Sequence, residues 1–237
     1  MKKRLLFQFF ACAMVVTGLS GFNQQDSVQE NTTTPNVIFI LTDDMGYGDL
    51  ECYGGFPYHT PNINKLANEG MRFTNFYVSQ AVCSASRSSF LTGCYPNRIG
   101  ISGALSPFAE IALNPEEETI AELLKEQGYK TGMVGKWHLG SNTPFLPLDH
   151  GFDEYLGLPV SHDYWPVNYD GKPADTSTTR GKWPVLKLIE GNERTKAITT
   201  LDDAGQLTTM YTEGAVSFIK KNKNNPFFLY LAHNLPH

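Results

Sequence analysis

The chain has 237 residues, of which 18% are charged and 41% hydrophobic, and its formal net charge is -5. This composition excludes a disordered, highly charged chain, a collagen, a coiled coil and a protein that crosses the membrane many times. The mild acidity also argues against a broad nucleic-acid-binding surface, which needs clustered lysine and arginine, so we expect no nucleic-acid partner.

Residues 1–21 have the pattern of a secretory signal peptide. A positively charged start, Met1–Arg4, precedes an apolar stretch, Leu5–Leu19, and small residues suited to cleavage. The apolar stretch is shorter than the ~18–20 residues that span a bilayer, which disfavours a membrane anchor. We expect export to the periplasm or the extracellular space, with lipoprotein anchoring at Cys12 as the second choice. Residues 22–34 are then a flexible leader.

Three cysteines remain once the signal peptide is removed: Cys52, Cys83 and Cys94. An odd number leaves at least one thiol without an intrachain partner, so a disulfide framework does not organise the fold. The sequence leaves open whether Cys52 pairs with Cys94.

From residue 35 onward, strand patterns alternate with helix patterns. Apolar runs predict strands at 35–42, 71–78, 129–139 and 226–232. Helical spacing predicts helices at 60–70, 116–127 and 206–221. Residues 141–205, rich in Pro, Gly, Asp and Thr, are expected to form a long surface excursion that shapes a pocket. The alternation predicts an α/β fold whose central, largely parallel sheet is flanked by helices.

Polar clusters follow three of the predicted strands: Asp43 with Asp44, Lys136 with His138, and His233 with His237. In open α/β sheets, ligands bind outside the carboxyl ends of the strands. Three polar clusters at one edge of the sheet indicate a ligand-binding site more strongly than any single cluster does.

Asp43 and Asp44 are adjacent carboxylates at the exit of a buried strand. Such a pair is costly unless a cation or hydrogen-bond donors compensate it. Oxygen ligands favour Ca²⁺ or Mg²⁺ over softer metals. A solvated turn with a helix-capping aspartate is an equally good interpretation of the pair alone.

Lys136 and His138 are two residues apart, so on a strand both point to the same face. A cation beside a titratable imidazole suits an anionic substrate, because one neutralises charge and the other moves protons. The alternative is a surface strand edge with unrelated polar residues.

A helix that begins near Cys83 would place this thiol at its positive end, with Arg87 one turn along on the same face. The thiol would then be activated as a nucleophile, and Arg87 would grip a tetrahedral oxyanion. These residues alone leave open a thiol hydrolase, a metal-ligating cysteine and an inert, half-buried cysteine.

The segment Cys83-Ser-Ala-Ser-Arg87, followed by Leu91-Thr-Gly93, resembles the signature of type I sulfatases, C-x-[PA]-S-R with a downstream T-G. Ala85 replaces the more common proline, a variant that bears on which maturation enzyme accepts the chain. Further blocks resemble the family in the correct order: 35–44, 46–49, 60–63, 70–75, 135–140, 157–163 and 227–237. The resemblance implies that residues 35–237 are the N-terminal part of a sulfatase catalytic domain with an alkaline-phosphatase-like sandwich fold.

The resemblance also implies a site. Cys83 would be oxidised to Cα-formylglycine by a formylglycine-generating or radical maturase, and would bind Ca²⁺ (or Mg²⁺) together with Asp43 and Asp44. The residues around the sulfate would be Arg87, Lys136, His138, Ser161 (as in arylsulfatases of the cerebroside-sulfatase type) and His237. The family's later Asp-Asn metal pair and a further sulfate-binding lysine lie beyond His237. We therefore expect residues 22–237 alone to be inactive or poorly folded.

The implied reaction is hydrolysis of a sulfate monoester on a small molecule or glycan. A hydroxyl of the hydrated formylglycine attacks sulfur, His237 protonates the leaving alcohol, and His138 takes the proton that lets sulfate depart. One alternative is a phosphomonoesterase or phosphodiesterase on the same scaffold, which Cys83 disfavours. The other is a non-catalytic protein that binds sulfated glycans and keeps an unmodified Cys83. The remaining histidines, His59, His150 and His162, are expected to be structural.

Overall fold

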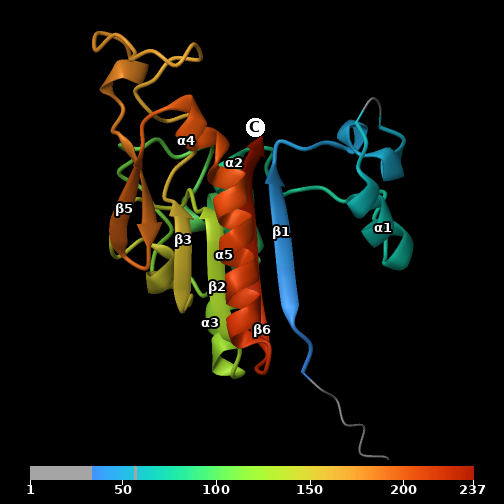
Figure 1. The fold of residues 1–237 in the computed structure, drawn as a ribbon. Helices are drawn as coiled ribbons and strands as arrows, with labels where there is room; N and C mark the ends of the chain where they lie inside the picture. Colours follow the sequence, from blue (N-terminus) through green and yellow to red (C-terminus); the bar gives the residue numbers. More distant parts are fainter. Residues whose placement is uncertain (1–33, 56–57) are drawn as a thin grey trace, which may run out of the picture. The chain divides into compact units, whose positions relative to one another are not determined.

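The computed structural model describes residues 34–55 and 58–237 (Figure 1). The predicted signal peptide and almost all of the leader lie outside the described residues, as does Cys12, so the predictions of export and of anchoring stay predictions. Among the helices of the described ranges, none combines the length and the apolar character needed to cross a membrane.

A six-stranded sheet organises residues 34–237, with the strand order β1-β6-β2-β3-β4-β5. Its members are β1 (Val37–Asp43), β2 (Lys130–Lys136), β3 (Glu154–Leu158), β4 (Leu186–Glu190), β5 (Glu193–Ile198) and β6 (Phe227–Pro236). The first four strands in this order run parallel, and β4 and β5 continue the sheet antiparallel. The predicted largely parallel sheet is confirmed.

The described ranges contain five α-helices, and the sheet has helices on both faces. They are α1 (Pro61–Glu69), α2 (Cys83–Thr92), α3 (Ile120–Glu126), α4 (Leu201–Gly205) and α5 (Leu207–Asn222). Helix α5 lies along β6 and β2 on one face (Figure 1). Residues of α2 and α3 pack in the hydrophobic cluster on the other face. Helix α3 begins four residues later than predicted because Thr119 caps it, in a reciprocal capping box with Glu122.

The sequence of strand β6 is continuously apolar because both of its faces are buried. Phe227, Leu229 and Leu231 join the cluster that contains residues of α5, whereas Phe228 and Tyr230 join the cluster on the opposite face. Successive side chains of a strand point to opposite faces, so a strand covered on both sides needs apolar residues at every position.

Gly135 and Gly157 are paired across β2 and β3 at a point of very close backbone approach. A Cβ at Gly157 would lie 1.8 Å from the carbonyl oxygen of Gly135, and a Cβ at Gly135 would lie 1.9 Å from that of Ala232. Gly135 also has a φ of +111°, which side chains disfavour. Both positions therefore require glycine. Gly135 directly precedes Lys136 at the end of β2, and Gly157 lies shortly before Ser161, which follows β3.

The predicted strand at residues 71–78 is wrong. The segment has no regular secondary structure, bends at residues 74–75, and pairs with no strand in the part of the chain that the structure describes. Two tyrosine hydroxyls bind its backbone instead: Tyr53 donates to the carbonyl of Phe73, and Tyr47 contacts both backbone groups of Phe76. The alternating apolar residues thus belong to a loop segment rather than to a strand.

The interpretation of residues 141–205 as a surface excursion is also wrong in part. This segment supplies β3, β4 and β5, half of the strands of the sheet. These strands have only five or six residues each, and polar residues interrupt them, so their pattern is weak. The same segment does line two cavities, as expected.

Candidate active site

The parallel strands β1, β6 and β2 bring Asp43, His237 and Lys136 to one edge of the sheet. Asp43 pairs in register with Pro236, and the backbone N–H of His237 donates to the carbonyl of Asp43 at 3.0 Å. Between Leu41 and Asp43 the register shifts, with β6 supplying two more residues than β1. Such irregularities re-aim a strand, and this one returns His237 to the end of β1.

Asp43 is buried between two cations. Lys136 Nζ lies 2.5 Å from Asp43 Oδ2, and Arg87 Nη2 lies 3.2 Å from Asp43 Oδ1. Burial favours the neutral acid, but Lys136 and Arg87 together hold the pKa of Asp43 below its ordinary value. The carboxylate is therefore compensated by side chains of this chain, as a charged group in this position requires.

Lys136 and Arg87 belong to one buried cluster. Lys136 Nζ also lies 2.9 Å from Ser161 Oγ, and Arg87 Nη1 donates to the carbonyl of Lys136 at 2.6 Å. The side chain of Arg87 leaves its Nε–H without a hydrogen-bond partner among the described residues. Two cations facing one carboxylate leave a net positive charge, and the free Arg87 donor suits an anion.

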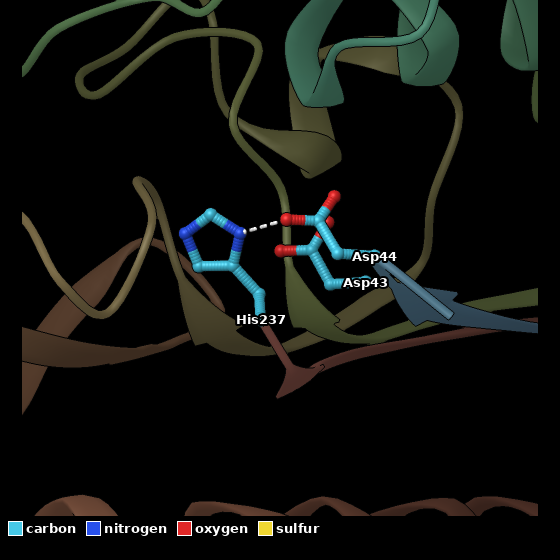
Figure 2. Close-up of side chains that lie close together, drawn as sticks. All are labelled: Asp43, Asp44 and His237. Atoms are coloured by element: carbon cyan, nitrogen blue, oxygen red, sulfur yellow. Dashed lines mark hydrogen bonds and ion pairs between the residues drawn. The ribbon is translucent and has the colours of Figure 1, made fainter. Parts of the chain in front are cut away.

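Asp44 and His237 form a second pair beside this cluster (Figure 2). His237 Nδ1 lies 2.5 Å from Asp44 Oδ2, and His237 Nε2 lies 3.6 Å from Asp163 Oδ1. Asp44 is exposed and has a φ of +60°. Such strain in a non-glycine residue is typical of functional positions.

Asp43, Asp44 and His237 each offer one ligand atom within 4.8 Å of the others. The two carboxylates fit Ca²⁺ or Mg²⁺, whereas an imidazole suits softer metals better. A Ca²⁺ ion takes about 6–8 oxygen ligands, so two aspartates supply only part of its shell. Cys83 is not in this group, and the metal-binding role predicted for it stays a prediction.

Cys83 is the first residue of α2, as the helix interpretation predicted. The thiol is half-buried and free, and Arg87 lies one turn further along the helix. Burial raises the pKa of Tyr164, with a smaller contribution from Asp163. Cys52 and Cys94 are also free, so the structure pairs no two of the three described cysteines.

His138 reaches the site differently from the prediction. Strand β2 ends at Lys136, and His138 has a φ of +61°, so alternation along a strand does not relate the two side chains. His138 Nε2 lies 2.7 Å from the carbonyl of Leu105, and its ring packs edge-on against Tyr164. Burial, followed by the charge of Lys136, lowers the pKa of His138 to about 3, so the imidazole is neutral.

Asp163 and Tyr164 are the neighbours that the sequence did not reveal. They come directly after Ser161-His162. Asp163 is the last residue of the 157–163 block, and Tyr164 lies just outside it. The other histidines lie apart from the buried cluster: His59 pairs with Glu51, His150 packs near Trp137, and His233 lies near Tyr211. His162 is closer, with its ring 5.8 Å from that of His237.

The model of the sulfatase family matches residues 35–237. The chain belongs to the sulfatase family. It is 39% identical to arylsulfatase A of Homo sapiens over 211 residues, which cover 86% of this chain and 41% of that protein. The chain thus spans about two fifths of the length of this relative.

Solved sulfatase structures share the fold. The crystal structure of PsFucS1 sulfatase from Pseudoalteromonas sp. matches with a TM-score of 0.76 and 30% identity, over 86% of this chain and 44% of that one. Ps i-CgsB, solved in complex with k-i-k-neocarrahexaose, matches with a TM-score of 0.71 and 33% identity, over 86% and 46%. The alkaline-phosphatase-like fold predicted from the resemblance is confirmed.

Proposed function

We propose that the whole protein is a sulfatase that hydrolyses sulfate monoesters. Family membership supports the reaction class. The observation that carries the proposal is the buried cluster in which Arg87 and Lys136 face the single carboxylate of Asp43, beside the N-terminus of α2. A sulfate ester develops negative charge on its oxygens, so positioned cations in a buried site lower the barrier to its cleavage.

The nucleophile in this proposal is Cα-formylglycine made from Cys83 by a formylglycine-generating or radical maturase. Its hydrated aldehyde supplies a hydroxyl that attacks sulfur and a second hydroxyl whose deprotonation expels sulfate. Support comes from the Cys83-Ser-Ala-Ser-Arg87 motif and from the position of Cys83 at the start of α2, where a helix stabilises negative charge.

The remaining residues take distinct roles. Arg87, Lys136 and Ser161 bind and orient the sulfate oxygens. His237 protonates the leaving alcohol, and His138 is the proposed acceptor of the proton that lets sulfate depart. Asp43 and Asp44 would hold Ca²⁺, or Mg²⁺, which supplies further positive charge beside the sulfate.

The proposed substrate is a sulfated small molecule or a sulfated glycan. The neighbour solved with k-i-k-neocarrahexaose supports a sugar, and the 30% identical PsFucS1 supports a sulfatase of the same fold. The signal-peptide pattern of residues 1–21 supports export to the periplasm or the extracellular space, where such glycans are met.

Mass spectrometry and kinetics of the whole protein test this proposal together. The peptide that contains residue 83 is expected to carry an aldehyde, and 4-nitrophenyl sulfate is expected to turn over faster than 4-nitrophenyl phosphate. Cys83→Ala should abolish turnover. A higher rate on the phosphate would identify a phosphoesterase instead. An unmodified thiol together with glycan binding and no turnover would identify a non-catalytic binding protein.

A further inference from the structure

A groove that the proposed mechanism does not use runs alongside the site. It consists of two cavities of about 150 Å³ and 240 Å³. Both are lined by the same five residues, which makes them neighbours: Pro107, Ser141, Asn142, Pro159 and Val160. We call the space lined by these five residues, with both cavities, the side groove.

One end of the side groove meets the candidate active site. His138 lines the smaller cavity. Val160, which lines both cavities, directly precedes Ser161, whose hydroxyl contacts the Lys136 ammonium. The side groove therefore approaches the buried cluster at His138 and one residue before Ser161.

The other end of the side groove is basic. Lys187 of β4 and Arg194 of β5 both line the larger cavity. Lys187 is exposed and forms no ion pair with any described residue. Arg194 donates to the carbonyl of Ser141 and to Asn142 Oδ1, which holds its guanidinium at the groove wall. Glu110 is the one acid among the residues that line the two cavities, so cations prevail.

The register of the sheet gives the length of this path. Gly135, Gly157, Ile189 and Arg194 pair in a continuous row across β2, β3, β4 and β5. Three strand spacings separate the first from the last, which corresponds to about 14 Å at ~4.8 Å per spacing. This span joins backbone positions and exceeds the length of a single sugar ring, so we expect a ligand that reaches from the buried cluster towards Arg194 to contain more than one ring.

We propose that Lys187 and Arg194 form a subsite for a second anionic substituent, carried by a sugar at some distance from the sulfate that is cleaved. The preferred substrate is then an acidic oligosaccharide rather than a small aryl or monosaccharide sulfate. This inference rests on the proposed sulfatase function. Apolar walls from Pro107, Pro159 and Val160 cover the sugar rings between the two anionic groups, and the tethered Arg194 is ordered before binding.

Calorimetry with the whole protein carrying Cys83→Ala tests the subsite without turnover. The probes are size-defined carrageenan and heparin oligosaccharides, from disaccharide to hexasaccharide. In at least one series, affinity is expected to rise about tenfold with length. Lys187→Ala with Arg194→Ala should remove most of this gain. Lys220→Ala with Lys223→Ala, which removes the same charge from exposed positions at the far end of α5, should keep it.

Each outcome decides a separate claim. A gain that is absent in both series, or that survives Lys187→Ala with Arg194→Ala, overturns the subsite. Carboxyl-reduced and partly desulfated heparin probes then assign the second anion to a uronate or to a sulfate. Release of sulfate by the unsubstituted protein is measured in parallel, both from the same oligosaccharides and from 4-nitrophenyl sulfate. Length-dependent binding without hydrolysis would refute the sulfatase function alone, and hydrolysis without length dependence would refute the subsite alone.

Discussion

Lys136 Nζ lies 2.5 Å from Asp43 Oδ2, and the two side chains are almost completely buried. The residues are 93 positions apart in sequence, on strands β2 and β1, which are separated by β6. An isolated charge in this place would be expensive, so each residue depends on the other. The cluster has a structural role as well as the role proposed for it in catalysis.

The first prediction concerns this pair. Lys136→Met leaves the buried Asp43 carboxylate with Arg87 as its only cation, and we expect a loss of about 3 kcal/mol in the free energy of unfolding. Urea denaturation of the whole protein at pH 7 measures the loss. In the double variant Lys136→Met with Asp43→Asn, the loss should be less than the sum of the losses in the two single variants, because both substitutions remove the same ion pair. If the single variant is as stable as the parent, the pair contributes nothing to folding.

The second prediction concerns pH. Because the pKa of His138 is lowered to about 3, the folded protein binds fewer protons than the unfolded chain between that value and the ordinary value near 6.5. Its contribution to stability is therefore complete above pH 6.5 and falls as the pH drops through this window, by at most about 5 kcal/mol.

His138→Gln tests this sign, because glutamine does not titrate. The free energy of unfolding should decrease less steeply between pH 6.5 and 4.5 in this variant than in the parent. His59→Gln is the matched control, since His59 is exposed and, among the described residues, pairs with Glu51 alone. Parallel slopes for His138→Gln and the parent would contradict a buried, neutral imidazole.

The third prediction concerns the metal. A chelator should lower kcat on 4-nitrophenyl sulfate at least tenfold, and Ca²⁺ should restore it, because the cation balances charge on the sulfate oxygens. Asp44→Asn should raise the Ca²⁺ concentration needed for half-recovery, and direct calorimetric titration with Ca²⁺ should give the same order. Asp49→Asn serves as the control, because Asp49 lies in the same loop outside the ligand group. Full activity after exhaustive chelation would rule out a metal-assisted reaction.

The fourth prediction concerns Asp163, which lies 3.6 Å from His237 Nε2 and orients the ring from the side opposite Asp44. In Asp163→Asn we expect kcat to fall about tenfold for esters with poor leaving groups, which need the proton from His237. The decrease should be smaller for 4-nitrophenyl sulfate, whose leaving group needs little protonation. A uniform loss across a series of leaving groups would assign Asp163 a structural role only.

The amino-acid sequence predicted the parts of the fold that are long and apolar. Strands β1 and β6 follow from continuous apolar runs. Both faces of β6 are covered, whereas only one face of β1 packs in a cluster, and Ile38 and Ile40 on its other face are exposed. The segment 71–78 looks the same locally, and only the tertiary contacts from Tyr47 and Tyr53 separate it from a strand. The short strands β4 and β5 become recognisable only when β3 is available to pair with them.

The candidate site was predictable to the extent that strand ends meet at one edge. The sequence therefore predicted that Asp43 and Lys136 lie at the same edge of the sheet. It did not predict that their side chains are in direct contact. The prediction that His138 and Lys136 point to the same face required the strand to continue through residue 138. Strand β2 ends at Lys136, two residues earlier. Asp163 escaped notice because its closeness to His237 depends on a loop and on the register shift in β6.

The long separation in sequence between β1 and β6 has a consequence for biosynthesis. Val37 pairs with Phe228, so β1 cannot pair with β6 until nearly all of residues 37–237 have been synthesised. At a translation rate of about 5–20 residues per second, residues 84–237 emerge roughly 8–30 s after Cys83. During this interval β6 has not yet paired with β1, and the Cys83 thiol is on an incompletely folded chain. An enzyme that modifies nascent chains would act on the thiol in this interval.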